Sequence, residues 1–328
     1  MTRWLITGAG GGLGSAVCRE LLAAGDSVRG VDLRRPHPAE GLTSRDRFEF
    51  RVGDVRQSTL MREALQGTDA LLHLAALTIR AASEDPLAAL DVNTRSFLDL
   101  MEAAVGAEPC PVMVFSSTTT LHNPNPAFLL ASTPEAISVT GRLRTPINLY
   151  AATKLFNELA AAHWRHQGLQ VVAVRLGLVT FPWGGQGLSR QIVDNLVRRP
   201  LKGTPALVPC ADDYPNWLSP GNAARACISA ARAAIDGTAK ECYDVVGQQR
   251  SMQEAIALAR TMFPRVRIDG TPGVGGLDQR GVKSDLDELG INHPDSLEDQ
   301  LHMLEAEIRA GGSAAVTGRT ASNVRLQV

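Results

Sequence analysis

The sequence predicts an α/β protein, with a doubly wound parallel sheet and a smaller C-terminal α/β substrate domain. Short β-branched runs alternate with helical patterns over residues 1–180, as expected for successive βαβ units. Several of these runs are continuously apolar, which is typical of strands covered by helices on both faces. The first run also leads directly into a glycine-rich turn and then into an amphipathic helix.

The expected strands and helices follow one another regularly along the chain. The strands are predicted at 3–7, 27–33, 48–54, 69–75, 111–117 and 171–179 from their β-branched and aromatic residues. Apolar residues at helical spacing predict helices at 14–25 and 93–105 between them. Adjacent parallel strands must be joined by crossover connections, which are usually helices. The alternation of strands and helices therefore favours one parallel sheet.

The character of the sequence changes after Phe181, where turn residues become dense between shorter periodic segments. We therefore expect a nucleotide-binding domain at 1–180 and a mainly substrate-binding region at 181–310. One late apolar run, at 243–247, is expected to return to the first sheet. Residues 311–328 have low hydrophobicity and no period, which predicts a flexible tail.

Composition and charge exclude several classes of partner. The 328 residues carry 33 basic and 34 acidic side chains, so no broad field attracts nucleic acid or a membrane surface. A small-molecule substrate is the expected partner. The five cysteines show no metal-ligand spacing, which predicts reduced thiols in a cytoplasmic protein without a metal. The longest apolar run is shorter than the roughly 20 residues that cross a bilayer.

The turn after the first strand has the spacing of a dinucleotide-binding loop. In TGAGGGLG, glycines stand at 8, 11 and 14, immediately before a helix. Such a turn needs residues without a Cβ where the pyrophosphate approaches the backbone, and the helix N-terminus attracts the phosphates. We therefore expect a Rossmann-type domain in which Gly8, Gly11, Gly12, Leu13 and Gly14 bind NAD or NADP.

Further cofactor contacts are expected at the ends of the following strands. Asp32 lies eighteen residues after Gly14, where a carboxylate hydrogen-bonds the adenosine ribose, so NAD is favoured over NADP. Arg34 and Arg35 follow, and they could instead pair with a 2′-phosphate. The remaining expected contacts are Leu33, Asp54, Val55, Leu74, Ala75 and Ala76. For Asp54, binding of the adenine amino group and capping of the next helix remain equal alternatives.

Tyr150 and Lys154 lie four residues apart in a stretch that reads as a helix, so they share one face. Such a pair also occurs by chance on helix surfaces. A nearby ammonium group favours the tyrosinate, which would bring the pKa of Tyr150 toward the range useful for proton transfer. The pair is therefore a candidate catalytic acid and base. His163 and His166 further along lack a third ligand and are expected on the helix surface.

Seven features in order, TGAGGGLG, Asp32, GDV, HLAA, Asn93, FSST and YAATK, resemble the extended short-chain dehydrogenase/reductase family, also called the NAD-dependent epimerase/dehydratase family. The resemblance implies that Tyr150 is the acid/base, Lys154 its partner and holder of the nicotinamide ribose, and Asn93 a supporting residue. It selects Thr118 as the catalytic hydroxyl, with Ser117 as the fallback. It also implies cofactor contacts at Asn93, Tyr150 and Leu176, and it allows a homodimer that pairs through the Tyr150 helix.

The resemblance also bears on the reaction. The family's dehydratases carry an Asp-Glu pair after the catalytic Thr, whereas Thr119 follows here, so dehydration is disfavoured. Segment 187–209 and NWLSPGNAARACISAA resemble the D-erythronate dehydrogenase-like branch, which acts on small sugar acids. Arg144 and Arg190 are then candidates for the substrate carboxylate. Thr118, Thr119 and Tyr150 are expected to contact the substrate, and Trp217 either lines the pocket or packs in the core.

The expected function is NAD-dependent oxidation of a secondary alcohol on a small sugar acid or related hydroxy compound. The alternative is a sugar or nucleotide-sugar epimerase that holds NAD tightly and shows no net redox change. A third interpretation, from another class of protein, is a binding protein that senses NAD. It is disfavoured because both Tyr150 and Lys154 are present.

Overall fold

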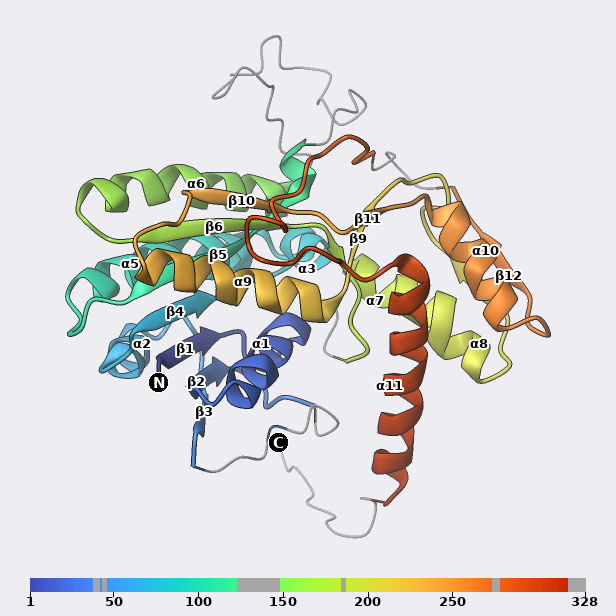
Figure 1. Ribbon diagram of the computed structural model, residues 1–328, viewed down its shortest axis with the longest axis horizontal. Coiled ribbons are helices and arrows are strands. Elements are labelled where there is room, and N and C mark those ends of the chain that lie inside the picture. The colour runs from blue at the N-terminus through green and yellow to red at the C-terminus, as the bar shows by residue number, and fades with distance from the viewer. Residues whose placement is uncertain (38–41, 43–45, 123–147, 184–186, 273–277, 318–328) are drawn as a thin grey trace.

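The protein is built around a seven-stranded sheet in which every neighbouring pair of strands is parallel (Figure 1). The computed structural model describes residues 1–37, 42, 46–122, 148–183, 187–272 and 278–317, with the side chains of 312–317 left out. The strand order is β10-β6-β5-β4-β1-β2-β3, so the direction of winding reverses between β1 and β4. The expected doubly wound Rossmann architecture is confirmed.

The strands of this sheet coincide closely with the expected runs. They are β1 (Arg3–Thr7), β2 (Ser27–Asp32), β3 (Phe48–Val52), β4 (Ala70–His73), β5 (Val112–Thr118), β6 (Val171–Leu176) and β10 (Cys242–Val245). The helices of this part of the chain are α1 (Gly12–Ala23), α2 (Ser58–Leu65), α3 (Ile79–Glu84), α4 (Pro86–Leu90), α5 (Ser96–Val105), α6 (Leu149–His166) and α9 (Pro220–Ile235). A π-type turn, η2 (Asp91–Arg95), joins α4 to α5, and the 3-10 turn η3 (Thr119–His122) follows β5.

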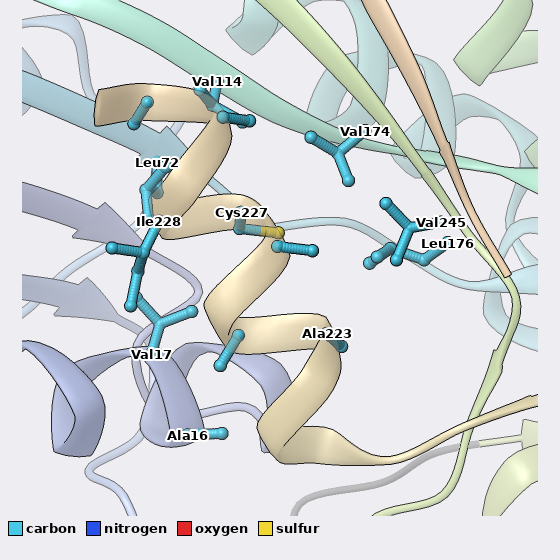
Figure 2. Packing of buried hydrophobic residues seen from close by; sticks show 14 of the residues in the cluster. Ala16, Val17, Leu72, Val114, Val174, Leu176, Ala223, Cys227, Ile228 and Val245 are labelled. Carbon is cyan, nitrogen blue, oxygen red and sulfur yellow. The ribbon is translucent and has the colours of Figure 1, made fainter. Parts of the chain in front are cut away.

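Alternate residues of each strand fill two separate cores. On β1, Trp4 and Ile6 join α1 and α9 on one face, whereas Leu5 joins α2 and α5 on the other. The period of two along a strand explains this division. Figure 2 shows the first core, where Leu72, Val114 and Val174 from the sheet surround Cys227 and Ile228 of α9. Because both faces are covered, these strands read as continuous apolar runs.

The C-terminal part of the chain forms a third core beside the sheet. Its elements are β7 (Leu178–Val179), α7 (Gly187–Val193), η5 (Asp194–Arg198), α8 (Arg199–Leu201), β8 (Ala206–Val208), β9 (Asn216–Leu218), β11 (Gln248–Gln249), α10 (Met252–Met262), β12 (Ile268–Gly270) and α11 (Leu297–Thr317). They include a three-stranded sheet, β11-β9-β7, and the pair β12-β8. Since β10 pairs with β6 and α9 packs on the main sheet, the two parts interleave in sequence.

The C-terminus differs from the expectation in one respect. The flexible tail was expected to begin at 311, but α11 continues to Thr317. Leu297, Leu301 and Leu304 of this helix lie in the third core at helical spacing, which anchors it. None of the helices in the described part of the chain is long and apolar enough to span a membrane.

Candidate active site

The glycine turn after β1 is a tight cradle that only residues without a Cβ can form. Gly8 has a φ of +72°, and a Cβ placed on it would lie 2.7 Å from the amide nitrogen of Ala75. A Cβ on Gly14 would lie 2.1 Å from the carbonyl oxygen of Gly8. The loops after β1 and β4 therefore meet at the point where the winding reverses, which is where such sheets bind ligands.

Helix α1 begins at Gly12, directly after this turn, and its N-cap residue Gly11 has no side chain that could cap the first turn. The first turn also lacks acidic residues, so its N–H groups and the positive end of the helix dipole suit a phosphate. The cradle thus fits the pyrophosphate of a dinucleotide. Contacts from Gly11, Gly12 and Leu13 to that group remain predictions.

Asp32 ends β2 at the edge of the cradle. Its two carboxylate oxygens accept hydrogen bonds from the backbone N–H groups of Gly10 and Arg34, each at 3.0 Å. These bonds fix the carboxylate at the position expected for the adenosine ribose. Leu33, the next residue, is 63% exposed and leaves an apolar surface beside it. The guanidinium of Arg35 lies over the Phe50 ring, 5.4 Å from its centroid.

Asp54 is engaged in a different way from the expected adenine contact. Both of its carboxylate oxygens accept hydrogen bonds from the Arg56 side chain, at distances down to 2.6 Å. These bonds lower the pKa of Asp54, with Arg56 as the main cause. The carboxylate therefore stabilises the turn before α2 but does not cap that helix, whose N-cap is Gln57. Its engagement by Arg56 weakens the adenine interpretation, which remains a prediction. Val55, beside it, is half-buried against the α2 and α5 core.

At the end of β4, the backbone N–H groups of Leu74 and Ala75 donate to Thr7 Oγ1, at 3.2 and 3.3 Å. The Thr7 hydroxyl therefore directs its own proton to His73 Nδ1, 2.8 Å away. Burial lowers the pKa of His73 to about 3, with a smaller contribution from the charge of Lys154. His73 is thus a neutral packed residue, and Leu74, Ala75 and Ala76 remain predicted cofactor contacts.

Tyr150 and Lys154 lie in the first turns of α6, whose N-cap Asn148 accepts a hydrogen bond from the N–H of Ala151. Lys154 is buried, only 1% exposed, in the interior against the end of β5. Its Nζ lies 3.5 Å from Ser116 Oγ and 5.6 Å from the centroid of the Tyr150 ring. A fully buried lysine is rare unless it is paired or functional, so the interpretation of this pair as two surface residues is wrong.

The pKa of Tyr150 is shifted in the opposite direction from the one that we expected from the sequence. Burial raises the pKa of Tyr150 to about 12, whereas we expected Lys154 to lower it. Burial also lowers the pKa of Lys154 to about 8, and the carboxylate of Glu158 opposes that change. Loss of hydration is therefore stronger than the attraction between the ammonium and the phenolate.

Asn93 lies in η2, and its side-chain hydrogen bonds are made to Leu77 and Thr153. Its side-chain amide donates to the Leu77 carbonyl and to Thr153 Oγ1 and accepts from the Leu77 N–H. Thr153 in turn donates to the Tyr150 carbonyl at 2.7 Å. Asn93 therefore supports the first turn of α6 through Thr153. Its direct contact with the cofactor remains a prediction.

The structure distinguishes between the candidate hydroxyl groups at the end of β5. Ser117 Oγ donates to Glu158 Oε1 at 2.6 Å, so it is committed to an interior contact. Thr118 Oγ1 lies 2.9 Å from Thr120 Oγ1, which supports Thr118 over the fallback Ser117. Thr119 donates to the Leu176 carbonyl and accepts from Gln279 while buried, so its expected substrate contact is replaced by a structural role.

Two of the remaining substrate candidates, Trp217 and Arg190, make other contacts in the described part of the chain. Trp217 is fully buried in the third core, with its indole N–H donating to the Arg250 carbonyl at 2.8 Å, so it packs and does not line a pocket. Arg190 pairs with Asp194 at 2.9 Å on the surface of α7. Arg144 lies outside the described residues. Leu176 ends β6 almost fully buried, and its cofactor contact remains a prediction.

Two aromatic residues follow β7, and Phe181 is the one that packs at the start of α1. A Cβ on Gly12 would lie 2.4 Å from Phe181 Cγ, so the Phe181 ring fills the space above the start of α1. The Trp183 ring stacks on His37, with 4.3 Å between the ring centroids and 3° between the planes. The guanidinium of Arg198 lies 4.8 Å from the Trp183 ring centroid. We call His37, Trp183 and Arg198 the aromatic clasp.

Several residues near the site were missed by the sequence reasoning. They are Ser116, Thr120, His122, Glu158, Arg175 and Asp244. Two signals were visible: Arg175 interrupts an apolar strand, and Glu158 continues the four-residue spacing of Tyr150 and Lys154. What these residues contact depends on how α6 packs against β5 and β6, which the sequence does not show.

A glycine cradle at a winding reversal, a carboxylate at the end of β2 and a buried lysine beside a tyrosine are the features expected of enzymes that exchange hydride with a nicotinamide cofactor. The model of the NAD-dependent epimerase/dehydratase family matches residues 4–245. The chain therefore belongs to that family, as the resemblance implied. The family is NAD-dependent, in agreement with the predicted cofactor.

Curated relatives include epimerases. UDP-glucuronate 4-epimerase 3 of Arabidopsis thaliana is 31% identical over 193 residues, which cover 55% of this chain and 43% of the relative. UDP-glucuronate 4-epimerase 1 of the same plant is 29% identical over 217 residues, covering 62% and 48%. The match thus spans less than half the length of these relatives.

Solved structures share the fold over nearly the whole chain. The UDP-glucose 4-epimerase of Thermus thermophilus, in complex with NAD, superposes with a TM-score of 0.75 and 22% identity over 94% of this chain and 99% of that one. The UDP-glucuronic acid 4-epimerase of Bacillus cereus, with UDP-glucuronic acid and NAD, gives 0.73 and 20% over 94% and 99%. At these identities the likeness establishes the fold.

Proposed function

We propose that this protein is an NAD-dependent epimerase that inverts a secondary alcohol centre of a sugar or nucleotide sugar. The observation that carries the proposal is the placement of Lys154, buried between the ring of Tyr150 and the end of β5 that bears Thr118. The related UDP-glucuronate 4-epimerases support epimerisation over net oxidation. This corrects the order of our expectations, in which oxidation of a small sugar acid came first.

A cofactor held in this cradle would supply the hydride acceptor and donor, and inversion would require the hydride to return to the opposite face of the same carbon. The glycine cradle and the N-terminus of α1 would hold the pyrophosphate, Asp32 the adenosine ribose and Lys154 the nicotinamide ribose. As a phenolate, Tyr150 takes the alcohol proton while hydride leaves, and as the resulting phenol it gives the proton back when hydride returns. Thr118 donates a hydrogen bond to the same substrate oxygen. The ammonium of Lys154 stabilises Tyr150 while it lacks its proton.

A cofactor that stays bound between the two half-reactions suits the surroundings of the cradle. Phe181 covers Gly12 at the start of α1, and the aromatic clasp connects the loop after β2 to η5. An epimerase needs no exchange of cofactor during turnover, whereas a dehydrogenase must release NADH each time. These contacts therefore favour the epimerase.

A sugar-acid dehydrogenase is the second candidate, because a specific sequence feature supports it. The family's nucleotide-sugar epimerases carry Asn-Pro after the arginine of the sixth strand, and here Leu176, Gly177 and Leu178 follow Arg175. The segment from Arg198 to Gly203, which forms α8 and its end, also keeps the pattern of the D-erythronate dehydrogenase-like branch. Membership of this chain in that branch remains a prediction.

One experiment separates the two candidates. The purified protein is incubated with UDP-glucuronate, UDP-glucose and a panel of aldonates and uronates, with and without added NAD. If the protein is an epimerase, we expect stereoisomers of the substrate to accumulate, as detected by NMR, with no NADH released to solution. Stoichiometric NADH formation from a sugar acid would instead establish the dehydrogenase, and no turnover of any compound would refute both substrate classes.

We further propose a homodimer that pairs through α6. Phe156 and Leu159, three residues apart on this helix, are 45% and 52% exposed and together offer an apolar surface to a second copy of the chain. Charged substitutions at both positions should convert the dimer to a monomer in sedimentation experiments. A wild-type protein that sediments as a monomer would contradict this proposal.

A further inference from the structure

Arg175 on β6 and Glu158 on α6 form an ion pair in the interior of the molecule. Arg175 Nη2 lies 2.6 Å from Glu158 Oε2, and Arg175 Nε donates to Glu158 Oε1 at 2.8 Å. Their side chains are 6% and 7% exposed. Two nearly parallel hydrogen bonds hold the guanidinium and the carboxylate in one defined geometry.

The carboxylate of Glu158 also connects two elements of the proposed active site. It accepts a hydrogen bond from Ser117 Oγ at 2.6 Å, and Ser117 directly precedes Thr118 on β5. On α6, Glu158 lies one turn after Lys154 and on the same face. Glu158 therefore joins the strand that bears the catalytic hydroxyl to the helix that bears Tyr150 and Lys154.

The guanidinium of Arg175 is held from its other side as well. Its Nη1 lies 3.2 Å from His122 Nε2 in η3 and 3.4 Å from Asp244 Oδ1 on β10. His122 and Asp244 are themselves 2.7 Å apart. The pair is thus fixed by groups from β5, β6, β10 and η3, so Glu158 has little freedom to move.

Stability alone is a poor explanation for such a pair. Desolvating two charges costs several kcal/mol, and apolar residues of similar volume often replace a buried ion pair without loss of stability. A buried ion pair does, however, impose a geometry that apolar packing does not. Because Glu158 lies one turn from Lys154, we infer that this geometry serves the proposed active site.

We propose that Glu158, clamped by Arg175 and Ser117, is a positioning residue that holds the Tyr150 and Lys154 face of α6 in register with Thr118. The inference rests on the proposed function, in which these three side chains transfer the proton. Glu158 acts through its neighbours, by fixing the helix and by placing a negative charge beside Lys154.

The charge of Glu158 has a definite effect on Lys154. Among the described residues, the titratable groups around these two are Tyr150 and Arg165 on α6, His73 on β4, Arg175 on β6, His122 in η3, and Cys242 and Asp244 on β10. Glu158 raises the pKa of Lys154, against the burial that lowers it to about 8. Without that carboxylate, the pKa of Lys154 would fall further, because the negative charge that favours the ammonium is lost while the positive charge of Arg175 stays.

The test compares the titration of Lys154 in the wild type and in Glu158→Gln. Isotope-labelled lysine NMR follows the amine, with the Lys154 signal identified by its loss in Lys154→Met. We expect the pKa of Lys154 to fall by about one unit, and the alkaline limb of kcat/KM to move with it. Unchanged titration of Lys154 in Glu158→Gln would overturn the proposal.

Matched variants separate charge, position and folding. Glu241→Gln removes a carboxylate that pairs with Arg165 on α6. The Glu241 side chain is 75% exposed, so solvent screens its charge and Lys154 should titrate as in the wild type. Glu158→Asp keeps the charge but shortens the side chain. It should preserve the pH profile while lowering kcat. If the proposed function is wrong, turnover is absent but the NMR shift persists.

Should Glu158→Gln fail to fold, Ser117→Ala decides the question. It removes the hydrogen bond to Glu158 and leaves the buried charges paired. The proposal predicts that kcat falls about tenfold while cofactor affinity and the pH profile are unchanged. A wild-type kcat in Ser117→Ala would overturn it.

Discussion

The ammonium group of Lys154 lies over the ring of Tyr150, with Nζ 5.6 Å from the ring centroid. The pKa of Tyr150 is about 12 and that of Lys154 about 8, so at pH 7 the pair is a phenol beside an ammonium ion. This is the state in which Tyr150 can return a proton to a substrate oxygen. Removal of a proton by Tyr150 requires the positive charge to be retained, so alkaline pH should inactivate the enzyme by neutralising Lys154.

Replacing Tyr150 with Phe should lower kcat by between about 100-fold and 10,000-fold, because proton transfer loses its acid and base. Affinity for NAD should change little, since the ring remains. Turnover is measured by NMR of product isomers, and affinity by fluorescence quenching. Tyr214→Phe, at a tyrosine that packs against Arg280, is the control and should keep full activity. Undiminished biological activity of Tyr150→Phe would favour the NAD-sensing interpretation.

Replacing Asp32 with Ala should weaken NAD binding by about 10-fold to 100-fold, because a charged hydrogen-bond acceptor at the ribose is lost. Binding of NADP should weaken less, so the ratio of the two dissociation constants should move toward NADP. Asp54→Asn is the matched control, since Arg56 already occupies that carboxylate. A larger loss of NAD affinity in Asp54→Asn than in Asp32→Ala would restore the adenine contact that the structure weakens.

Replacing Trp183 with Ala should increase the dissociation rate of NAD by about tenfold, since stacking on His37 and the contact with Arg198 are both lost. Stopped-flow fluorescence with the loaded enzyme measures this rate. Trp164→Ala removes another half-buried indole, on α6, and controls for general destabilisation. Equal dissociation rates in both variants and the wild type would show that the aromatic clasp does not retain the cofactor.

Acid should destabilise the protein partly through His73. Its pKa is about 3 in the folded protein against 6.5 ordinarily, so between these values the unfolded chain binds a proton that the folded protein does not. The free energy of unfolding should therefore fall as pH falls, by up to about 1.4 kcal/mol per pH unit from this group. Urea unfolding of His73→Gln should show a shallower decline below pH 6. A slope equal to that of the wild type would contradict the assignment.

Much of the fold was predictable because its signals are local. The strands ending at Thr7 and Asp32 were visible as apolar runs, and the glycines at 8, 11 and 14 marked the turn that lies between them. Where several segments had to be combined, the sequence left alternatives open. Trp217 was as compatible with a pocket wall as with a core, and only the packing of the third core placed its indole against Arg250.

The electrostatics of the site were equally hidden from the sequence. The sequence placed Lys154 one turn from Tyr150 and predicted attraction between an ammonium and a phenolate. Burial decided the outcome, because loss of hydration raises the pKa of Tyr150 and lowers that of Lys154. The burial of Tyr150 and Lys154 depends on how α6 packs against β5. It cannot be derived from their four-residue spacing along one helix.

The sequence by itself determined the phosphate cradle and the chemical groups available at the site, since glycine spacing and a helical repeat are encoded within a few residues. Only the tertiary structure placed the two candidate hydroxyl groups in different contacts, with Ser117 donating to Glu158 and Thr118 beside Thr120, which supports the prediction of Thr118. It also brought together Arg175 and Glu158, which lie 17 positions apart in the sequence. Such contacts depend on the packing of strands and helices from distant parts of the chain, where distance and burial set each interaction.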